Sequence, residues 1–480
     1  MNYKLVLKLN GYILMFDAVF MIIPIICAVI YKESAGFAFL PTMAIMAVIG
    51  AALAFLLKPK NKDLYARDGF ATVAIAWIIM SFMSSLPFFF SKEIPNLIDC
   101  FFETASGYTT TGATILTNVE KLSKCMLLWR SFTHWIGGMG VLVFMLAFAP
   151  LAGAHNIQLM RAESPGPKVE KLVPKTNATA KVLYGMYIFL TFLQFVLLLL
   201  AKMPVFDALT TAFGTAGTGG FGIKNDSMAS YSFACQTIVT VFMLLFAVNF
   251  NIYFLLIFRK FKAVWKNEEL RMFVCVVALA IVLITANNFG LFDSLYTAFH
   301  HSAFTVASIV STTGFATVDF NLWPEFSKFI LFALMFMGGC AGSTGGGIKV
   351  SRILIMLKFL KKDLLSLIHP RSINTISMNG KKIEDETIKK INSYLICYIA
   401  ILFFSIAITA LDNFGFETTI TAAVTTINNV GPGFAGVGPV ENFSNFSYLS
   451  KIVLSFNMIF GRLEIFPLII LFMSHTWKKY

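Results

Sequence analysis

The sequence has 480 residues, of which 57% are hydrophobic and 13% are charged, and its mean hydropathy is +0.76. A soluble domain is about 45–50% apolar and about 25% charged, so this composition excludes an ordinary soluble protein and indicates a polytopic membrane protein. The net charge of +13 does not indicate a nucleic-acid partner, because the basic residues fall in alternate loops between apolar segments.

Long apolar segments recur along the whole chain. A helix needs about 20 residues to cross a hydrocarbon core of about 30 Å. We predict ten spans, at about 10–31, 36–57, 69–91, 125–150, 182–202, 233–257, 272–290, 325–357, 391–411 and 448–475. Lys and Arg concentrate near 4–8, 58–67, 161–181, 259–271, 358–390 and 478–479. The positive-inside rule makes these segments cytoplasmic, together with both termini.

A glycine-centred phrase recurs four times, at intervals of roughly one hundred residues. Its copies are Thr110, Thr111 and Gly112; Thr218, Gly219 and Gly220; Thr312, Thr313 and Gly314; and Asn429, Val430 and Gly431. All four fall on the predicted outer side. Each follows a stretch too short or too polar to cross, at about 96–109, 204–217, 294–311 and 415–428. We interpret these stretches as half-helices of re-entrant loops, because irregular backbone at membrane depth must be buried or line a water-filled path.

This recurrence predicts one pore lined by four unlike quarters. Inward-pointing backbone carbonyls can replace the hydration shell of a monovalent cation, and glycine permits the backbone angles that such a ring requires. The C-terminal end of each half-helix adds a negative dipole end that favours a cation. The fourth copy begins with Asn429 instead of threonine and contains Pro432, so the symmetry is only pseudo-fourfold. A lone copy would more simply be a loop turn.

The expected fold is therefore all-α: four pseudo-repeats of helix, pore helix, filter and helix surround a central pore, and an N-terminal helical hairpin precedes them. We place the hairpin at 1–66 and the four repeats at 67–160, 161–260, 261–385 and 386–480. The alternative is an all-helical bundle with glycine-rich external loops.

The chain resembles the TrkH/KtrB/HKT superfamily of potassium transporters, and TrkH most closely. The resemblance covers nearly the whole chain and includes the four phrases, R-S-F-T-H-W-I-G-G-M-G at 130–140, G-G-C-A-G-S-T-G-G-G-I-K at 338–349 and G-R-L-E-I-F-P at 461–467. It implies a homodimer in the bacterial cytoplasmic (inner) membrane, with one pore per subunit. It also implies a cytoplasmic nucleotide-binding regulatory ring resembling TrkA, and a preference for K⁺ because Gly112, not serine, occupies the first filter position.

The glycine-rich stretch 338–347 interrupts the eighth predicted span and must face protein or the cavity. It is not a Walker motif, because Ile348 separates the last glycine from Lys349 and no strand precedes it. The resemblance makes it a gating loop beneath the filter, with Gly345, Gly346, Gly347 and Lys349 as candidate gating residues. A packing kink is the alternative.

Arg462 lies deep in the tenth predicted span, where a cation is costly and usually functional. We expect it to face the pore below the filter, where it repels waiting cations or anchors the gating loop. A packing salt bridge, with Glu464 as a candidate partner, is the alternative. His134 fits a buried, hydrogen-bonded residue better than a proton relay. Three carboxylates near the phrases, at Glu103, Asp207 and Asp319, either attract cations or cap and solvate local structure.

The functional hypothesis is potassium uptake through a channel-like pore that a cytoplasmic subunit gates from inside. A potassium symporter coupled to protons or sodium is the main alternative, although few carboxylates lie within the spans. An enzyme or a receptor without ion flux is less consistent with the sequence. K⁺ is the expected transported ion, and we expect no organic cofactor in this chain.

Overall fold

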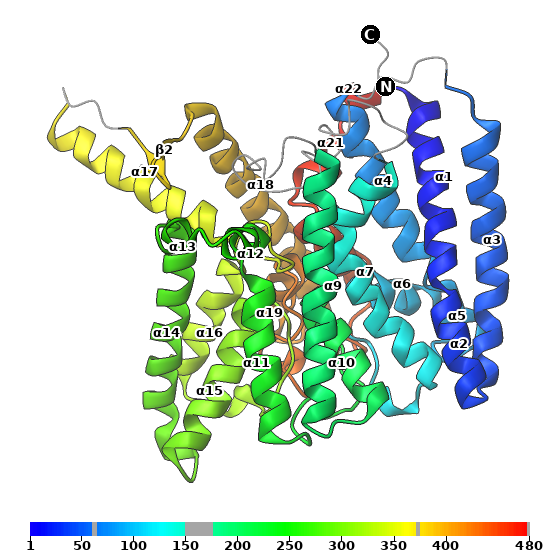
Figure 1. Ribbon diagram of the computed structural model, residues 1–480, viewed down its shortest axis with the longest axis horizontal. Helices are drawn as coiled ribbons and strands as arrows, with labels where there is room; N and C mark the ends of the chain where they lie inside the picture. The colour runs from blue at the N-terminus through cyan, green and yellow to red at the C-terminus, as the bar shows by residue number, and fades with distance from the viewer. Residues whose placement is uncertain (60–64, 149–175, 371–374, 478–480) are drawn as a thin grey trace.

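The computed structural model describes residues 1–59, 65–148, 176–370 and 375–477 (Figure 1). Within these ranges the regular structure is helical, apart from one short antiparallel pair, β1 (Ser377–Met378) and β2 (Lys381–Lys382). Among the described residues, six helical segments are long and apolar enough to cross a membrane, and a bent pair of helices would make a seventh. The expected all-α polytopic membrane fold is confirmed.

The N-terminal hairpin consists of α1 (Tyr3–Phe20), α2 (Ile22–Tyr31), η1 (Ser34–Ala38), α3 (Phe39–Ala51) and η2 (Ala52–Leu56). Its two arms pack closely at glycines: a Cβ on Gly11 would lie 2.7 Å from the Gly50 carbonyl oxygen. The turn between the two arms also makes hydrogen bonds to a helix of the first proposed repeat. Both carboxylate oxygens of Glu33 accept bonds from the backbone at the start of α7 (Lys124–Phe148), from Lys124 N at 2.8 Å and Cys125 N at 2.9 Å.

The first half of the remaining chain contains α4 (Ala66–Met83), α5 (Leu86–Phe90), α6 (Leu97–Tyr108), η3 (Val119–Lys121), α7 (Lys124–Phe148), α9 (Thr176–Leu200), α10 (Val205–Gly217), α11 (Phe233–Ala247), α12 (Phe250–Ile257) and α13 (Phe261–Trp265). Short polar side chains start several of these helices, as helix N-caps do. Asn96 caps α6 by accepting from Ile98 N, and Ser232 caps α11 by accepting from Cys235 N.

The second half contains α14 (Glu268–Asn288), η5 (Phe289–Leu291), α15 (Leu295–Val310), η6 (Phe320–Leu322), α16 (Glu325–Met337), α17 (Val350–Ile368), α18 (Asp385–Thr409), η7 (Ala410–Asp412), α19 (Phe416–Ile427), η8 (Ala435–Val437), α20 (Tyr448–Arg462), α21 (Phe466–Phe472) and α22 (Ser474–Trp477). The short helices α6, α10, α15 and α19 correspond to the four predicted half-helices. Each ends within two residues of its glycine phrase.

Three predicted spans are not continuous. The eighth, expected at 325–357, is interrupted between α16 and α17 by residues 338–349, as its glycines indicate. The sixth, expected at 233–257, bends by 94° between α11 and α12, because Asn249 starts a new helix by accepting a bond from Asn251 N. The tenth, expected at 448–475, breaks after Arg462, where Glu464 and Ile465 have positive φ. The fourth expected span ran to 150, and the proposed boundary between 160 and 161 follows it; residues 149–175 lie outside the described part of the chain.

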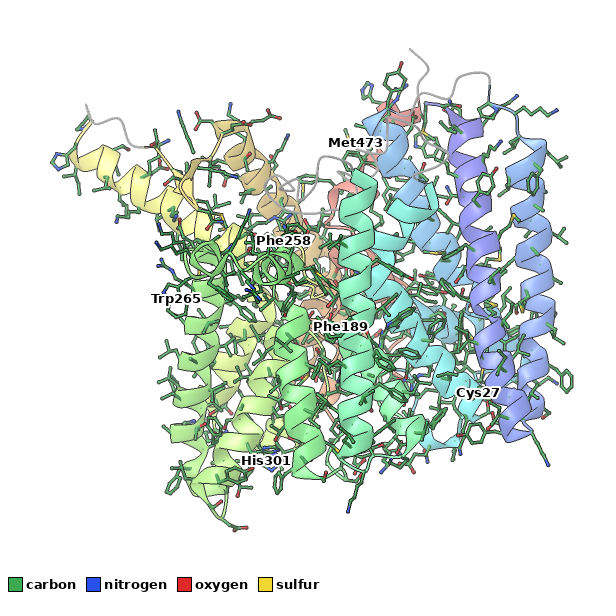
Figure 2. All side chains as sticks on the ribbon, viewed as in Figure 1. Cys27, Phe189, Phe258, Trp265, His301 and Met473 are labelled. Atoms are coloured by element: carbon green, nitrogen blue, oxygen red, sulfur yellow. The ribbon has the colours of Figure 1, made fainter. Side chains whose placement is uncertain are left out.

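The two described ends of the chain meet at one end of the molecule, beside α22 (Figure 1). There the rings of Tyr3 and Trp477 stack, with their centroids 5.8 Å apart. The helices α12, α13 and α17 lie toward the same end. Large apolar side chains are exposed around the outside, including Phe189 on α9 at 61% and Trp265 on α13 at 80% (Figure 2). An apolar exterior of this extent is typical of helices that face lipid.

Candidate functional site: four glycine phrases and the loop beside them

The four glycine phrases share one backbone conformation. Their first residues, Thr110, Thr218, Thr312 and Asn429, have φ between 54° and 60°, and the glycines two positions later have φ between 71° and 95°. The residue between each pair keeps negative φ. Positive φ is strained for most L-residues and readily accessible to glycine, which occupies the third position of every phrase. The phrases are therefore four copies of the same backbone turn.

The four turns close into a ring in chain order. A Cβ on Gly112 would lie 2.1 Å from the Gly219 carbonyl oxygen, and one on Gly220 would lie 1.9 Å from that of Thr313. One on Gly314 would lie 2.5 Å from the Val430 carbonyl oxygen. One on Gly431 would lie 2.6 Å from that of Thr111, which returns the sequence of contacts to the first turn. The structure thus brings together all twelve residues of the predicted filter.

The ring faces a cavity on one side. A cavity of about 120 Å³ is lined by all four glycines and by the residues that follow them, among them Thr114, Gly222 and Pro432. The C-terminal ends of α6, α10, α15 and α19 approach the ring from the residues before the phrases. Their negative dipole ends favour a cation near the ring.

Loop 338–349, between α16 and α17, lies against the other side of the ring. The Gly346 amide donates to Thr312 Oγ1 at 2.6 Å. A Cβ on Gly346 would lie 2.5 Å from the Asn428 carbonyl oxygen, and one on Gly345 would lie 2.9 Å from that of Ser311. The loop packs against the residues that precede the third and fourth glycines, so the ring lies between the loop and the cavity.

The candidate gating residues hold this loop together. Lys349 is 5% exposed, and its ammonium donates to the Gly345 carbonyl oxygen across the loop. Gly347 packs against Gly338 at the start of the loop, where an added Cβ would lie 2.7 Å from Gly338 Cα. The loop is a compact turn that closes on itself.

Arg462 joins three parts of the site. Its Nη1 donates to Thr110 Oγ1 at 3.2 Å and to the Thr344 carbonyl oxygen at 2.6 Å. Its Nη2 donates to the Gly137 carbonyl oxygen of α7 at 2.6 Å. One guanidinium therefore connects the first glycine phrase, the loop and α7. This arrangement fits the expectation that Arg462 anchors the loop.

Glu464, the candidate partner of Arg462, forms a buried ion pair with another residue. Its carboxylate pairs with Arg352 near the start of α17, and the side chains of both are at most 10% exposed. Arg352 also lies 4.2 Å from the Tyr394 ring centroid on α18. This buried pair connects the break after α20 to the helix that follows the loop, and sequence spacing gave no sign of it.

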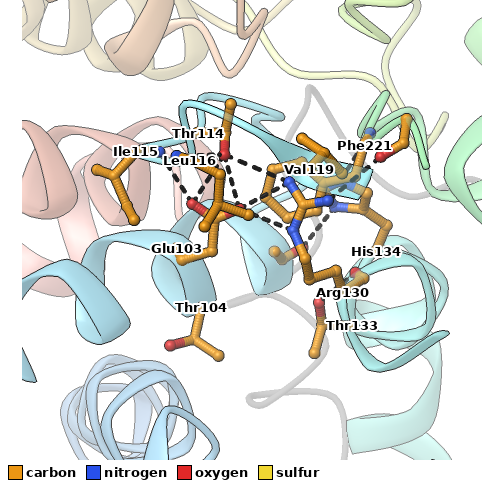
Figure 3. Close-up of polar contacts among 12 residues, drawn as sticks. Glu103, Thr104, Thr114, Ile115, Leu116, Val119, Arg130, Thr133, His134 and Phe221 are labelled. Carbon is orange, nitrogen blue, oxygen red and sulfur yellow. Dashed lines mark hydrogen bonds and ion pairs between the residues drawn. The ribbon is translucent and has the colours of Figure 1, made fainter. Parts of the chain in front are cut away.

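Glu103 of α6 and Arg130 of α7 form a buried ion pair beside the ring, with Oε1 and Nη2 2.7 Å apart (Figure 3). The carboxylate also accepts bonds from Thr114 Oγ1 at 2.9 Å and Ile115 N at 3.0 Å, just after the first glycine phrase. The guanidinium lies 4.0 Å from the ring centroid of Phe221. These contacts fix the backbone that follows the first glycine phrase, so Glu103 has a structural role.

The other two carboxylates near the phrases also have local partners. Asp207 accepts a bond from Tyr231 Oη at 2.8 Å, and burial raises the pKa of the Tyr231 hydroxyl above its ordinary value. Asp319 caps η6 by accepting from Asn321 N at 3.0 Å. Their observed contacts favour the capping interpretation over an external field.

His134 connects the first half-helix to the second phrase. Its Nδ1 lies 2.8 Å from the Gly107 carbonyl oxygen, and its Nε2 lies 3.2 Å from the Phe221 amide nitrogen. A carbonyl only accepts and an amide N–H only donates, so these partners require a neutral ring with its proton on Nδ1. Both nitrogens are used, which supports the buried, hydrogen-bonded histidine over a proton relay.

A family model described as "TrkH: Cation transport protein" matches residues 35–479. The chain belongs to the TrkH family. The Trk system potassium uptake protein TrkH of Salmonella typhimurium is 35% identical, with all of both chains covered. The Trk system potassium uptake protein TrkG of Escherichia coli is 33% identical over 99% of each. The crystal structure of the potassium transporter TrkH from Vibrio parahaemolyticus matches with a TM-score of 0.89 and 32% identity over all of both chains.

Membership of the TrkH family bears out the resemblance seen in the sequence. The relatives are transport proteins, so the expectation that the chain is not an enzyme is confirmed. The full-length match in structure also accounts for the N-terminal hairpin, which is part of the fold that the TrkH relative shares.

Proposed function

We propose that the chain takes up potassium across the bacterial cytoplasmic membrane, passing K⁺ through the ring of four glycine phrases. The observation that carries this proposal is the closed ring itself, with a cavity on one side and loop 338–349 on the other. The relatives named as potassium uptake proteins support the choice of ion.

The ring suits a cation because carbonyl oxygens and negative helix ends gather there. An ion that enters must lose water, and rings of backbone carbonyls can replace its hydration shell. The middle residues Thr111, Gly219, Thr313 and Val430 supply carbonyl oxygens that lie at the contacts between neighbouring turns. K⁺ is the transported ion in this proposal, which requires no organic cofactor.

Loop 338–349 acts as the gate in this proposal. It lies directly against the third and fourth phrases through Gly345 and Gly346. Lys349 and Arg462 hold it in place through the carbonyl oxygens of Gly345 and Thr344. Displacement of the loop would open the path below the ring. Since α17 begins at Val350, directly after the loop, movement of α17 is a route by which a cytoplasmic partner would control the gate.

The proposed assembly follows the family. We assign a homodimer with one pore per subunit, both termini in the cytoplasm, and regulation by a nucleotide-binding ring resembling TrkA. The start of α1 and the basic helix α17 lie toward the end of the molecule that holds the termini, and their charge supports this orientation by the positive-inside rule. The four pore repeats at 67–160, 161–260, 261–385 and 386–480 and the hairpin at 1–66 remain our division of the chain.

Potassium flux across liposome membranes tests the function. Vesicles loaded with K⁺ and containing the purified protein should release K⁺ when a protonophore supplies the compensating charge, and Na⁺ should pass more slowly. The symport alternative predicts instead that K⁺ moves together with H⁺ or Na⁺ in the same direction, so that a gradient of the co-ion drives K⁺ against its own gradient. Absence of K⁺ flux, in vesicles and in a bacterium that lacks its own uptake systems, contradicts the proposal.

A further inference from the structure

A buried carboxylate in the N-terminal hairpin lies at the end of the first half-helix. Asp17 of α1 is 2% exposed. Its Oδ1 accepts a bond from Tyr108 Oη at 2.7 Å, and its Oδ2 accepts one from Ser84 Oγ at 2.7 Å. The two hydroxyl oxygens lie 3.0 Å from each other. Asp17, Ser84 and Tyr108 form a closed triangle that we call the hairpin triad.

The hairpin triad joins four helices. Asp17 belongs to α1, Ser84 follows the last residue of α4, and Tyr108 is the last residue of α6. The fourth helix is α7, because the Ser84 carbonyl oxygen accepts a bond from Trp129 Nε1 at 3.1 Å. The hairpin, which lies outside the four proposed repeats, is in this way tied to the base of the first repeat.

Tyr108 is placed to transmit the position of Asp17 to the glycine phrase. It lies two residues before Thr110, where φ turns positive, and four before Gly112. Its backbone is held tightly as well: a Cβ on Gly137 would lie 1.8 Å from the Tyr108 carbonyl oxygen. The Gly137 carbonyl oxygen in turn accepts from Arg462. The side chain of Tyr108 is fixed by the hairpin and its backbone by α7.

Packing alone does not explain a carboxylate at position 17. In the described part of the chain, Asp17 forms no ion pair, and its partners are the two hydroxyl groups. Burying a carboxyl group is costly unless hydrogen bonds compensate for the lost water. A leucine at this position on an apolar helix would pack without that cost. What the acid supplies is two acceptor oxygens that orient two donors at once.

We propose that Asp17 is a positioning residue for ion selectivity: through the Tyr108 hydroxyl, the N-terminal hairpin sets the geometry of the first glycine phrase. This inference rests on the proposed function, because it treats that phrase as one quarter of the potassium filter. If the filter discriminates K⁺ from Na⁺ by how its oxygens fit the ion, those oxygen positions must be held, and the bond from Tyr108 to Asp17 restrains the first quarter.

The test compares Na⁺ and K⁺ permeability of the full-length protein in lipid bilayers. The variants are Asp17→Asn, Tyr108→Phe and their combination, and Gly112→Ser is the reference that alters the ring directly. The matched control is Thr42→Val, which removes another buried hydroxyl from the same hairpin, one that donates to the Ala38 carbonyl oxygen at 3.2 Å. Size-exclusion profiles check that each variant is folded.

We expect Asp17→Asn and Tyr108→Phe each to raise the Na⁺/K⁺ permeability ratio by about two- to tenfold, which is the effect that loss of one hydrogen bond supports. The double variant should show no larger change than the stronger single one, because Asp17 acts through Tyr108. Thr42→Val should keep the ratio of the unaltered protein.

Three results overturn the inference while leaving the proposed function intact, provided that Gly112→Ser raises the ratio. These are unchanged ratios in both single variants, fully additive changes in the double variant, or an equal change in Thr42→Val. If Asp17→Asn does not fold, Tyr108→Phe and Ser84→Ala decide: a shift in both supports the inference, and a shift in neither overturns it. An unchanged ratio in Gly112→Ser contradicts the filter itself.

Discussion

Asn429 Nδ2 donates a hydrogen bond of 2.9 Å to Thr111 Oγ1, across 318 positions of sequence. The same amide nitrogen lies 2.8 Å from the Met458 carbonyl oxygen of α20. The fourth glycine phrase, which departs most from the others in sequence, is therefore the one that binds the first phrase through a side chain. Threonine at this position has one hydroxyl hydrogen and cannot donate to both acceptors.

The first prediction concerns this contact. Asn429→Thr makes the fourth phrase resemble the other three, yet we expect it to raise the Na⁺/K⁺ permeability ratio, because at least one of the two bonds is lost. The loss of one buried bond costs about 1–3 kcal/mol when its partner stays unsatisfied. Bi-ionic reversal potentials measure the ratio. Asn392→Thr, at an exposed position of α18, is the control, and equal ratios for both variants would contradict the role of Asn429.

The second prediction concerns Arg462. Arg462→Lys keeps the charge but replaces a planar fork of donors with a compact ammonium. It cannot hold the carbonyl oxygens of Thr344 and Gly137 in the present arrangement, so we expect higher basal K⁺ flux into liposomes without the regulatory partner. Arg271→Lys, at an exposed position of α14, should have no effect. Normal flux combined with a lower yield of folded Arg462→Lys would make this residue structural.

The third prediction uses the tight contact of the loop with the ring. The added Cβ of Gly346→Ala would lie 2.5 Å from the Asn428 carbonyl oxygen and 2.9 Å from Asn429 Cβ. The backbone on both sides must then separate, so basal K⁺ flux should rise. Gly290→Ala is the matched control, because its Cβ meets nothing within 4 Å.

Shortening residues 342–347 should raise basal flux in the same direction as Gly346→Ala. A shortened protein that expresses normally and conducts at or below the level of the unaltered one would identify the loop as a packing kink. Flux is best followed with a fluorescent K⁺ assay at matched protein content per vesicle.

The fourth prediction separates stability from permeation at the Glu103–Arg130 pair. Removal of one partner of a buried pair leaves an uncompensated charge and costs about 3–5 kcal/mol. We expect Glu103→Leu or Arg130→Met to lower the Tm of the purified protein markedly, and the double variant to recover much of the loss. Tm values that fall additively in the double variant would show that the two side chains do not act as a pair.

The conformation of the glycine phrases was largely predictable from the sequence. Four glycines recur behind four half-helices, and only a backbone with positive φ requires glycine so regularly, as Gly112 and Gly431 show. Their location on one side of the membrane was also predictable, because the distribution of Lys and Arg placed every phrase on the outer side. The order in which the turns contact one another required the structure.

The helix breaks show what hydropathy misses. The 94° bend between α11 and α12 falls in an apolar segment, and Asn249, its capping residue, was the only local sign. The break after Arg462 had a clearer sign, since Pro467 lies in the first turn of α21, where proline starts helices readily. A hydropathy window averages over both positions and therefore predicts continuous spans.

Long-range pairs of side chains were the least predictable part of the site. Glu103 and Arg130 each lie in a mainly apolar segment, and two such charges in neighbouring helices are a reasonable sign of a buried pair. Asp17 is likewise a charged residue in an apolar segment. Its hydroxyl partners Ser84 and Tyr108, however, are residue types too common to be identified from the sequence. Their selection depends on how the helices pack.

The central claim, that the ring of glycine phrases is a potassium filter, is tested most directly by Gly112→Ser. A serine Cβ would lie 2.1 Å from the Gly219 carbonyl oxygen, at a φ of +83° that disfavours any side chain. The ring must distort, and we expect the Na⁺/K⁺ permeability ratio in a bilayer to rise by about tenfold, which corresponds to about 1.4 kcal/mol in relative barrier height. A folded variant with the ratio of the unaltered protein would contradict the account.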